Sequence, residues 1–503
     1  MFKNAVYLCA MATPWIKVAK RLESEFNIKS SYFIHWQMDK DEFISSGLKN
    51  CHLQTIEDAW KMQGFPKNIQ RHFFDEEELK KIAHYELIAL KMMDRLDPDD
   101  ESFPFNSRLS FFRDLLGYWF NVVEDRDIDL VISSPVPHCV FDYALFVICK
   151  IKKIKFITFQ RILLFGNYNI LIDDIDNMPK LNLQLFNGNL PSEIIQAKIN
   201  NVLQDYNQAK PFYMIVQEKI NARLTYFKLL QNFLRKIPKL YYLFKSPNTY
   251  WVQKGRLPNE SKYSWLELFF TKYKRALKVR SFKKHYDAIV TDNLPEKFVL
   301  VALNYQPEET SCPSGGVYAD QILMLQLLNQ HLPKNINIIV KEHKTQFYLS
   351  TESASGRNQN FYRQISKIDK RVKFVSENYN PFVLIDKAKA VVTIGGTIGW
   401  ESAIRGTPTL IFGRAWYENM PRVLKVKTKE DLAKALLQVE ELKNKDLHSE
   451  ILGFHAALED KVIKSYQYRI SIPFVPSTDV TTEESIDNLV KGISKNLSLK
   501  NKA

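Results

Sequence analysis

The sequence has few cysteines and no long hydrophobic run, and each absence excludes a class of protein. Its five cysteines are scattered without CxxC spacing, so neither a zinc site nor a disulfide framework is expected. No run approaches the roughly 20 apolar residues of a membrane-spanning helix. The N-terminal stretch MFKNAVYLCAMATPWIKVAKRL is broken by polar residues and lacks a small-residue cleavage site. No internal repeat and no low-complexity segment is apparent. We therefore expect a globular, cytosolic protein.

The positive charge of the chain is concentrated in one region. The 503 residues are 45% hydrophobic and 13% aromatic, which is ample for two or three domains with cores. The net charge is +14, yet residues 210–285 alone hold 18 Lys and Arg against three acidic residues, so the remainder is close to neutral. Such a block favours a polyanion, which could be nucleic acid, an anionic membrane surface or an acidic polysaccharide.

Strands and helices alternate in two parts of the chain, which predicts an α/β protein with two Rossmann-like domains facing a cleft. Expected strands lie at 5–11, 32–35, 129–133, 155–159, 298–305, 336–340, 372–375, 391–394 and 409–412. Expected helices lie at 14–26, 109–119, 141–149, 319–332, 398–404, 429–443 and 482–497. The predicted units are an N-terminal domain (1–205), a basic, aromatic helical insertion (206–285), a C-terminal domain (286–480) and a final helix (481–503).

A glycine turn follows the buried strand VVTI. Gly395, Gly396 and Thr397 lead into a helix at 398–404, so backbone N–H groups and the positive end of a helix dipole face the same point. The two glycines would let a phosphate approach closely, which predicts a nucleotide-phosphate site. A turn that only eases packing, with Thr397 as a plain helix cap, is the alternative.

Two further groups of polar residues follow strands and belong to the same predicted edge of the sheet. Lys341, Glu342 and His343 come directly after INIIV, and a donor imidazole there would hold a phosphate or assist its departure. The alternatives are that Lys341 is a solvated surface cation and that His343 is a structural histidine. Glu401, one helical turn after Thr397, would approach the same ligand unless it pairs with Arg405.

The third group is the loop NYQPEET after the strand FVLVAL. Glu308, Glu309 and Thr310 are candidates to read ribose or base groups, with Pro307 stiffening the loop. A plain acidic loop is the alternative.

The motifs NYQPEET, IIVKEHK and VVTIGGTIGWESAIRGTPTLIFGRAWY, in this order and spacing, resemble the capsule polysaccharide biosynthesis family. These bacterial glycosyltransferases include the retaining β-Kdo transferases. The resemblance is strong over residues 298–425, weaker over 129–176 and absent from the basic block. It implies a GT-B fold with the donor nucleotide on the C-terminal domain, and a CMP-activated ulosonic acid such as Kdo as donor. Where the family often has a His-Pro pair that receives the CMP phosphate, this chain has His343 and Lys344.

The implied reaction needs a carboxylate or base opposite the leaving phosphate. We expect this group from the N-terminal domain. Asp142, after the strand DLVIS, is one candidate; Asp173 and Asp174, in NYNILIDDIDN, are favoured by the family's nucleophilic Asp. For each, a surface carboxylate is the alternative. His138 is a candidate base on the acceptor side.

Neither a metal ion nor another cofactor is expected, because the nucleotide sugar is itself the substrate. The DxD pattern at Asp127 and Asp129 precedes its strand and so lies at the wrong end of the sheet for the cleft. The expected acceptor is a glycan or lipid-linked glycan, reached from the cytoplasm, with residues 210–285 on the inner face of the membrane.

Other functions remain open from the sequence. A UDP-sugar GT-B transferase or an epimerase would share the fold and the glycine turn. A non-catalytic assembly or polyanion-binding protein would use the basic block. Nucleic acid is not an expected partner, because no RNA- or DNA-binding module is recognisable.

Overall fold

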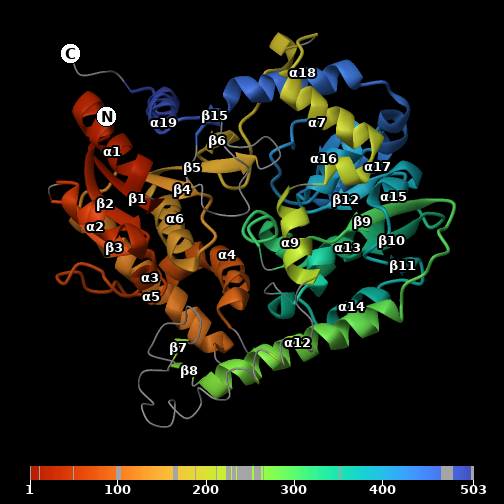
Figure 1. Ribbon diagram of the computed structural model, residues 1–503, viewed down its shortest axis with the longest axis horizontal. Helices are drawn as coiled ribbons and strands as arrows, with labels where there is room; N and C mark the ends of the chain where they lie inside the picture. The colour runs from red at the N-terminus through yellow and green to blue at the C-terminus, as the bar shows by residue number, and fades with distance from the viewer. Residues whose placement is uncertain are drawn as a thin grey trace.

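Figure 1 shows a computed structural model of the protein, which describes most of the chain. The residues outside the description are 1, 11, 49, 98–102, 163–167, 187, 211, 307, 350–352, 466–479, 500–503, and 223–264 except 228, 231, 234, 252, 253, 262 and 263. Two α/β domains stand side by side, each built on its own sheet. The predicted fold class, GT-B-like with two Rossmann-like domains, is confirmed.

The N-terminal sheet has seven strands in the order β15-β6-β5-β4-β1-β2-β3. Neighbours from β5 to β3 pair in parallel, whereas β6 and β15 are antiparallel at one edge. The strands are β1 Asn4–Ala10, β2 Lys29–His35, β3 His52–Thr55, β4 Leu130–Pro135, β5 Lys155–Ile162, β6 Tyr168–Ile172 and β15 Ile463–Lys464. The helices are α1 Ala12–Phe26, α2 Lys40–Ser45, α3 Ile56–Ala59, α4 Glu76–Met92, α5 Phe105–Asp125 and α6 Val140–Lys152.

Helix α6 has apolar residues around almost its whole circumference, and other elements of the protein pack against all of it. It lies between the sheet and the helices α4 and α5, so its residues from Val140 to Cys149 are all buried. Trp119 of α5 donates its indole N–H to the carbonyl of Phe141 at 3.0 Å, which locks the two helices together. The carboxyl ends of β4 and β5 therefore rest on a packed layer and open toward the second domain.

The C-terminal sheet has six parallel strands in the order β11-β10-β9-β12-β13-β14. Its strands are β9 Phe298–Ala302, β10 Asn337–Lys341, β11 Val372–Val375, β12 Val391–Thr393, β13 Thr409–Ile411 and β14 Val423–Lys425. Its helices are α13 Gln321–His331, α14 Gln359–Ser366, α15 Pro381–Lys387, α16 Thr397–Ile404, α17 Lys429–Asn444 and α18 His448–Lys461. The strand order reverses between β9 and β12, and ligands of open α/β sheets bind at such a switch point.

The two domains exchange elements near the expected boundaries at residues 205 and 480. Helix α7 (Glu193–Gln204) lies against α16, and Arg405 donates to the carbonyl of Val202 at 2.6 Å, so the chain joins the second domain before residue 205. At the other end, β15 pairs with β6 of the first sheet. The last helix, α19 (Thr482–Asn496), then packs on α1 (Figure 1).

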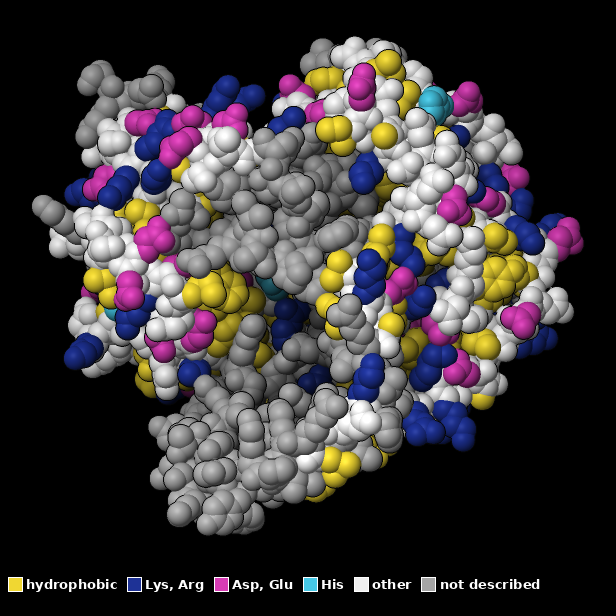
Figure 2. All heavy atoms as spheres, viewed as in Figure 1, with side chains coloured by type: hydrophobic (Ala, Val, Ile, Leu, Met, Phe, Trp, Pro, Cys, Tyr) yellow, Lys and Arg dark blue, Asp and Glu magenta, His cyan; other side chains and the backbone are white. Residues whose placement is uncertain are grey.

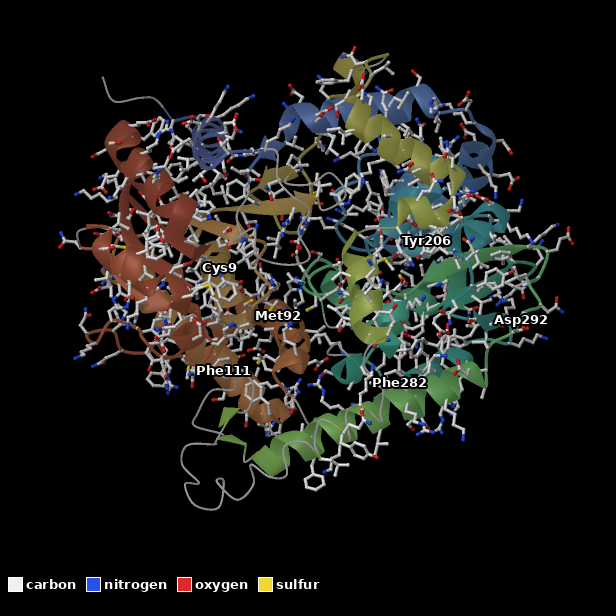
Figure 3. The ribbon with its side chains drawn as sticks, viewed as in Figure 1. Cys9, Met92, Phe111, Tyr206, Phe282 and Asp292 are labelled. Atoms are coloured by element: carbon white, nitrogen blue, oxygen red, sulfur yellow. The ribbon has the colours of Figure 1, made fainter. Side chains whose placement is uncertain are left out.

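The basic region lies partly outside the described residues. Its described elements are α8 Tyr206–Ala209, α9 Phe212–Ala222, β7 Val252–Gln253, β8 Lys262–Tyr263 and α12 Trp265–Asp287, and most of residues 223–264 of the predicted helical insertion lie outside the described residues. In the second half of α12, Ala276, Val279, Phe282 and Tyr286 are buried at helical spacing. Phe282 points from α12 into the C-terminal domain (Figure 3), where its ring is 5.8 Å from that of Phe347.

The outward face of α12 is cationic. Lys274, Arg280 and Lys284 are exposed, and Figure 2 shows Lys and Arg side chains gathered at the lower right, over this end of the helix. Phe270 and Leu277 are also exposed. Within the described ranges, no helix combines the length and the apolar character that crossing a bilayer requires.

Candidate active site

A cavity of about 560 Å³ separates the two domains, within the range that holds a nucleotide-sized ligand. Its C-terminal wall is the carboxyl edge of β9, β10, β12 and β13, which includes the switch point between β9 and β12. Its N-terminal wall comes from the ends of β4 and β5, where Val136, His138 and Arg161 line it. Most of the residues singled out in the sequence meet here: Lys341, His343, Gly395, Gly396, Thr397, Glu401, Glu308, Glu309 and Thr310.

The glycine turn lies where the sequence places it, between β12 and α16. Asn304, at the end of β9, fixes it from behind: its side-chain oxygen accepts from the Thr393 hydroxyl at 2.9 Å and from the Ile394 amide at 3.2 Å. Gly396 caps α16 with an ordinary backbone φ of −66°. The first turn of α16 thus faces the cavity, with N–H groups that have no partner inside the helix.

Gly395 and Gly396 differ in how much space each position leaves for a side chain. A methyl group at Gly395 would lie 2.6 Å from the carbonyl oxygen of Arg414, and backbone cannot yield cheaply. A methyl group at Gly396 would lie 3.1 Å from the side-chain nitrogen of Asn304. The close approach of two chain segments therefore requires glycine at 395 more strictly than at 396.

This difference is testable by two alanine variants. We expect Gly395→Ala to cost about 1–3 kcal/mol of unfolding free energy and to weaken nucleotide binding, because the Arg414 segment must move. The unfolding free energy of Gly396→Ala should lie within about 0.5 kcal/mol of that of the parent. Urea unfolding and nucleotide titration of both variants measure this, and equal behaviour of the two would contradict the steric reason.

Lys341, Glu342 and His343 all line the cavity, but the Glu342 carboxylate is engaged by the buried Arg357. Lys341 donates to the carbonyl of Glu377 at 2.7 Å, and burial lowers its pKa to about 8, so it is mostly charged at pH 7. Burial, with the Lys341 and Arg357 cations, lowers the pKa of His343 to about 4. The imidazole is therefore neutral at pH 7, and it acts as a hydrogen-bond donor without charge.

The neutral ring of His343 has a defined tautomer. Its Nδ1 accepts the backbone N–H of Thr345 at 3.3 Å, which caps the short 3₁₀ turn Lys344–Phe347. An accepting Nδ1 places the single ring proton on Nε2. This N–H is then free to donate to an anion in the cavity.

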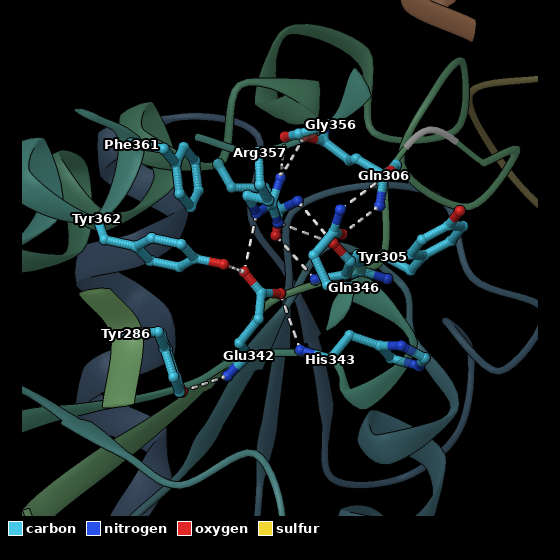
Figure 4. Close-up of polar contacts among 12 residues, drawn as sticks. Tyr286, Tyr305, Gln306, Glu342, His343, Gln346, Gly356, Arg357, Phe361 and Tyr362 are labelled. Carbon is cyan, nitrogen blue, oxygen red and sulfur yellow. Dashed lines mark hydrogen bonds and ion pairs between the residues drawn. The ribbon is translucent and has the colours of Figure 1, made fainter. Parts of the chain in front are cut away.

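Glu342 belongs to a buried network that holds the loops together (Figure 4). Its carboxylate pairs with Arg357 at 2.8 Å, with both side chains fully buried, and accepts the Tyr362 hydroxyl at 2.9 Å. Arg357 also donates to Gln306 Oε1 at 2.6 Å and to the Asn304 carbonyl at 3.0 Å. The network ties the loop after β9 to the loop after β10, so it positions the cavity wall.

Two cavity carboxylates have raised pKa values. Burial raises the pKa of Glu308 to about 7, and burial also raises that of Glu401 to about 7. The predicted alternative for Glu401, an ion pair with Arg405, is wrong, because Arg405 pairs with Asp386 at 2.6 Å. Both carboxyl groups thus lie on the cavity in reach of a ligand and titrate near neutral pH.

The structure does not bring Asp173 and Asp174 to the cavity. We expected the segment after β5 to end at the cleft, but β6 runs antiparallel to β5 and carries the chain back toward the opposite edge of the sheet. Asp173 there pairs with Lys155, the first residue of β5, at 2.7 Å. Asp174 accepts from the side chain of Asn177 at 2.7 Å and holds a loop.

Asp142 is buried, and its carboxylate caps α6. Its oxygens accept the backbone N–H groups of Cys139 at 2.8 Å and His138 at 3.2 Å. Burial raises its pKa well above the usual range. The carboxylate is therefore a positioning group that fixes the loop carrying His138, and it does not line the cavity.

His138 lies on the cavity and has the opposite tautomer to His343. Its Nδ1 is 2.7 Å from the carbonyl of Val136, and a carbonyl can only accept, so Nδ1 carries the proton. Nε2 then keeps a lone pair. The site thus has a hydrogen-bond donor on one wall and a base on the other.

Metal ligands are sparse in the described part of the chain. The one group of side chains close enough to share an ion there is His138, Cys139 and Asp142, and the Asp142 oxygens are engaged by backbone amides. Asp129, of the DxD pattern, accepts from the amides of Lys3 and Asn4 at the start of β1, away from the cavity. Metal-independent chemistry stays a prediction.

Several cavity residues had no signal in the sequence. Arg161, Tyr206 and Gln217 line the site but belong to no recognised motif, and Arg414, which also lines it, lies within a motif without having been singled out. Lys344, which stands where the family often has a proline, pairs with Glu218 of α9 at 3.1 Å. Helix α9 is thereby docked on the loop after β10, so the start of the basic region forms part of the active-site wall.

The comparisons with known proteins agree with the motifs. Residues 259–423 match the family model described as capsule polysaccharide biosynthesis protein. No curated protein matches the sequence.

Among solved structures, a β-Kdo 2,7 transferase from Thermosulfurimonas dismutans aligns at 9% identity over 83% of this chain and 97% of its own, with a TM-score of 0.29. A UDP-GlcNAc 2-epimerase from Methanocaldococcus jannaschii, in complex with UDP-GlcNAc and UDP, aligns at 13% identity over 91% and 98%, with a TM-score of 0.23. A glycosyltransferase from Rickettsia africae aligns at 9% over 98% and 99%, with a TM-score of 0.24. These scores are too low to bear on substrate or residue roles.

The family match covers the strands, the glycine turn and the His343 loop of the C-terminal domain. It supports the expected enzyme class, a glycosyltransferase, and the resemblance of this part of the chain to the capsule polysaccharide biosynthesis family.

Proposed function

We propose that this protein transfers a sugar from a CMP-activated ulosonic acid, such as Kdo, to a glycan or lipid-linked acceptor during surface polysaccharide synthesis. The observation that carries the proposal is the pair of opposed histidines across the cavity. Neutral His343 offers an N–H beside the glycine turn, and His138 offers a lone pair from the other domain. Glycosyl transfer needs one group of each kind.

The C-terminal wall fits the leaving nucleotide. The phosphate would lie on the first turn of α16, which shares the cavity wall with the Lys341 cation and His343. Negative charge grows on this phosphate as the glycosidic bond breaks, so these donors stabilise the transition state more than the ground state. Glu308, Glu309 and Thr310, on the adjacent loop, would read the ribose or base.

The N-terminal wall fits the acceptor. His138 Nε2 would take the proton of the attacking hydroxyl, and Asp142 holds the His138 loop in place. Glu308 and Glu401, with pKa values of about 7, are the cavity carboxylates able to accept a proton or face the developing positive charge. Both glutamates belong to the C-terminal wall, on the same side of the cavity as the phosphate.

Nucleotide binding tests the proposal. CMP at about 100 times its dissociation constant should stabilise the protein by about 2.7 kcal/mol, and UDP at the same concentration should do far less. Thermal shifts with CMP, CDP and UDP, each with and without EDTA, measure this. Stabilisation by UDP alone would contradict the CMP assignment and favour an epimerase or a UDP-sugar transferase. In a separate transfer assay, loss of activity in EDTA that Mn²⁺ restores would contradict metal-independent transfer.

We also propose that the protein acts in the cytoplasm, at the inner face of the membrane. The exposed side of α12 combines Lys274, Arg280 and Lys284 with Phe270 and Leu277, a combination suited to an anionic lipid surface. The protein should float with vesicles that contain about one-third anionic lipid and stay unbound to neutral vesicles. Lys274→Glu with Lys284→Glu should reduce flotation, and equal flotation with both kinds of vesicle would contradict the electrostatic contact.

A further inference from the structure

Arg414 is a buried cation on the wall of the active site. It follows β13 in the segment that packs against the glycine turn, and its backbone N–H donates to the Ser314 carbonyl at 2.8 Å. Its side chain is 3% exposed yet lines the cavity. Its backbone therefore lies beside Gly395, at the proposed phosphate position, while its side chain lines the same cavity.

The guanidinium of Arg414 has fewer partners than its burial demands. One terminal nitrogen donates to the Ser314 hydroxyl at 3.1 Å, and the other contacts the Met178 sulfur, a weak acceptor, at 3.5 Å. Its Nε has no partner among the described residues. Burial lowers its pKa, although Glu309 and Glu418 lie near enough to favour the charged form.

Other buried arginines of the same domain are satisfied by the protein. Arg422 donates to the carbonyls of Ala403, Leu442 and Lys445. Arg371 donates to the carbonyls of Pro333 and Ile336 and to the side chain of Asn329. A buried charge without such partners is costly unless something else neutralises it. Because Arg414 faces the cavity, a ligand anion is the natural partner.

Resting on the proposed function, we infer that Arg414 forms a subsite for the carboxylate of the donor sugar and makes the site selective for acidic sugars. The planar guanidinium matches a carboxylate through two parallel hydrogen bonds. In a CMP-linked ulosonic acid the carboxylate is attached to the same anomeric carbon as the phosphate oxygen, so the two anions lie side by side. The Arg414 backbone lies against Gly395, and the Arg414 side chain lines the same cavity as the glycine turn. A neutral sugar would leave Arg414 unpaired.

The test compares two probes on the full chain: CMP, which has the phosphate only, and CMP-Kdo, which has both anions. Arg414→Met should weaken CMP-Kdo binding by about 10- to 100-fold and change CMP binding by less than about threefold. Arg414→Lys keeps the positive charge but loses the planar guanidinium, so its affinity for CMP-Kdo should lie between those of the parent and Arg414→Met. Without ligand, Arg414→Met should melt no lower than the parent, whereas Arg422→Met should melt lower and keep the parent's ratio of the two affinities.

The outcomes separate the possibilities. Equal weakening of both probes would assign Arg414 to the phosphate and overturn the carboxylate subsite. Unchanged binding of both probes by Arg414→Met would overturn any ligand contact. A parent protein that binds UDP and not CMP would overturn the proposed donor itself, and the subsite with it.

Discussion

Replacing His343 by alanine is expected to lower kcat for sugar transfer by about 100- to 1,000-fold, the usual effect of removing one preorganised donor to a developing anion. His343 lines the same cavity as Gly396 and Thr397 at the start of α16, where the phosphate would leave, and its accepting Nδ1 leaves the ring proton on Nε2. The donor is held in one orientation by the Thr345 amide, so it needs no rearrangement as charge develops. KM for the donor should change little, because the contact strengthens mainly in the transition state.

Two variants control this prediction. His343→Gln keeps an N–H donor at a similar reach and should retain more activity than alanine. His448→Ala removes an exposed histidine remote from the cavity and should leave kcat unchanged. Steady-state kinetics of the three proteins, with melting curves as a check on folding, decide the matter; full activity of a folded His343→Ala protein would remove this residue from the reaction.

The pH dependence has a sign that follows from the same burial. Since the pKa of His343 is lowered to about 4, its ring stays neutral from pH 8 down to about pH 5, and no loss of activity in that range comes from it. His343 also affects stability, because its pKa is lower in the folded state than in the unfolded state. Between about pH 6.5 and 4 the unfolded chain binds a proton at this ring and the folded protein does not, so the free energy of unfolding falls as the pH drops through this range. Glu308 and Glu401, with pKa values of about 7, are the expected source of any acid limb near neutrality.

The nucleotide wall could be predicted from the sequence because short-range patterns determine it. A β-branched strand followed by glycines and a short helix leaves little freedom, and parallel strands bring their carboxyl ends to one edge. Lys341, His343 and Gly395 therefore meet as expected. The motifs also marked Glu308 and Glu401, although their raised pKa values required knowledge of burial.

The acceptor wall could not be read in the same way. Whether the strand after β5 continues the parallel order or turns back is decided by long-range packing, and β6 turns back, which removes Asp173 and Asp174 from the cavity. The ion-pair partner of Glu342 could not be predicted from the sequence either. Arg357 lies in a connection between β10 and α14 with no motif, and only the fold shows that it enters the core.

The buried pair of Glu342 and Arg357 gives the largest expected effect on stability. Arg357→Met should lower the unfolding free energy of the C-terminal domain by about 3–5 kcal/mol, because it leaves the Glu342 carboxylate buried without its cation. Gln306 and the Asn304 carbonyl lose donors in the same step, so the loop behind the glycine turn should loosen. Urea unfolding followed by near-ultraviolet circular dichroism measures the loss, and nucleotide titration measures its effect on the site.

A double-mutant cycle separates the pair from the cost of an orphaned charge. Glu342→Leu alone should be about as harmful as Arg357→Met, since it strands the guanidinium, whereas the two changes together should cost about 2 kcal/mol less than their sum, because no charge is then left buried. Lys389→Met is the matched control: it breaks an exposed pair with Glu440 of similar length, 2.9 Å, and should cost under about 1 kcal/mol. Additive losses in the cycle would mean that Glu342 and Arg357 stabilise the domain independently, through Tyr362 and Gln306, and that their contact is incidental.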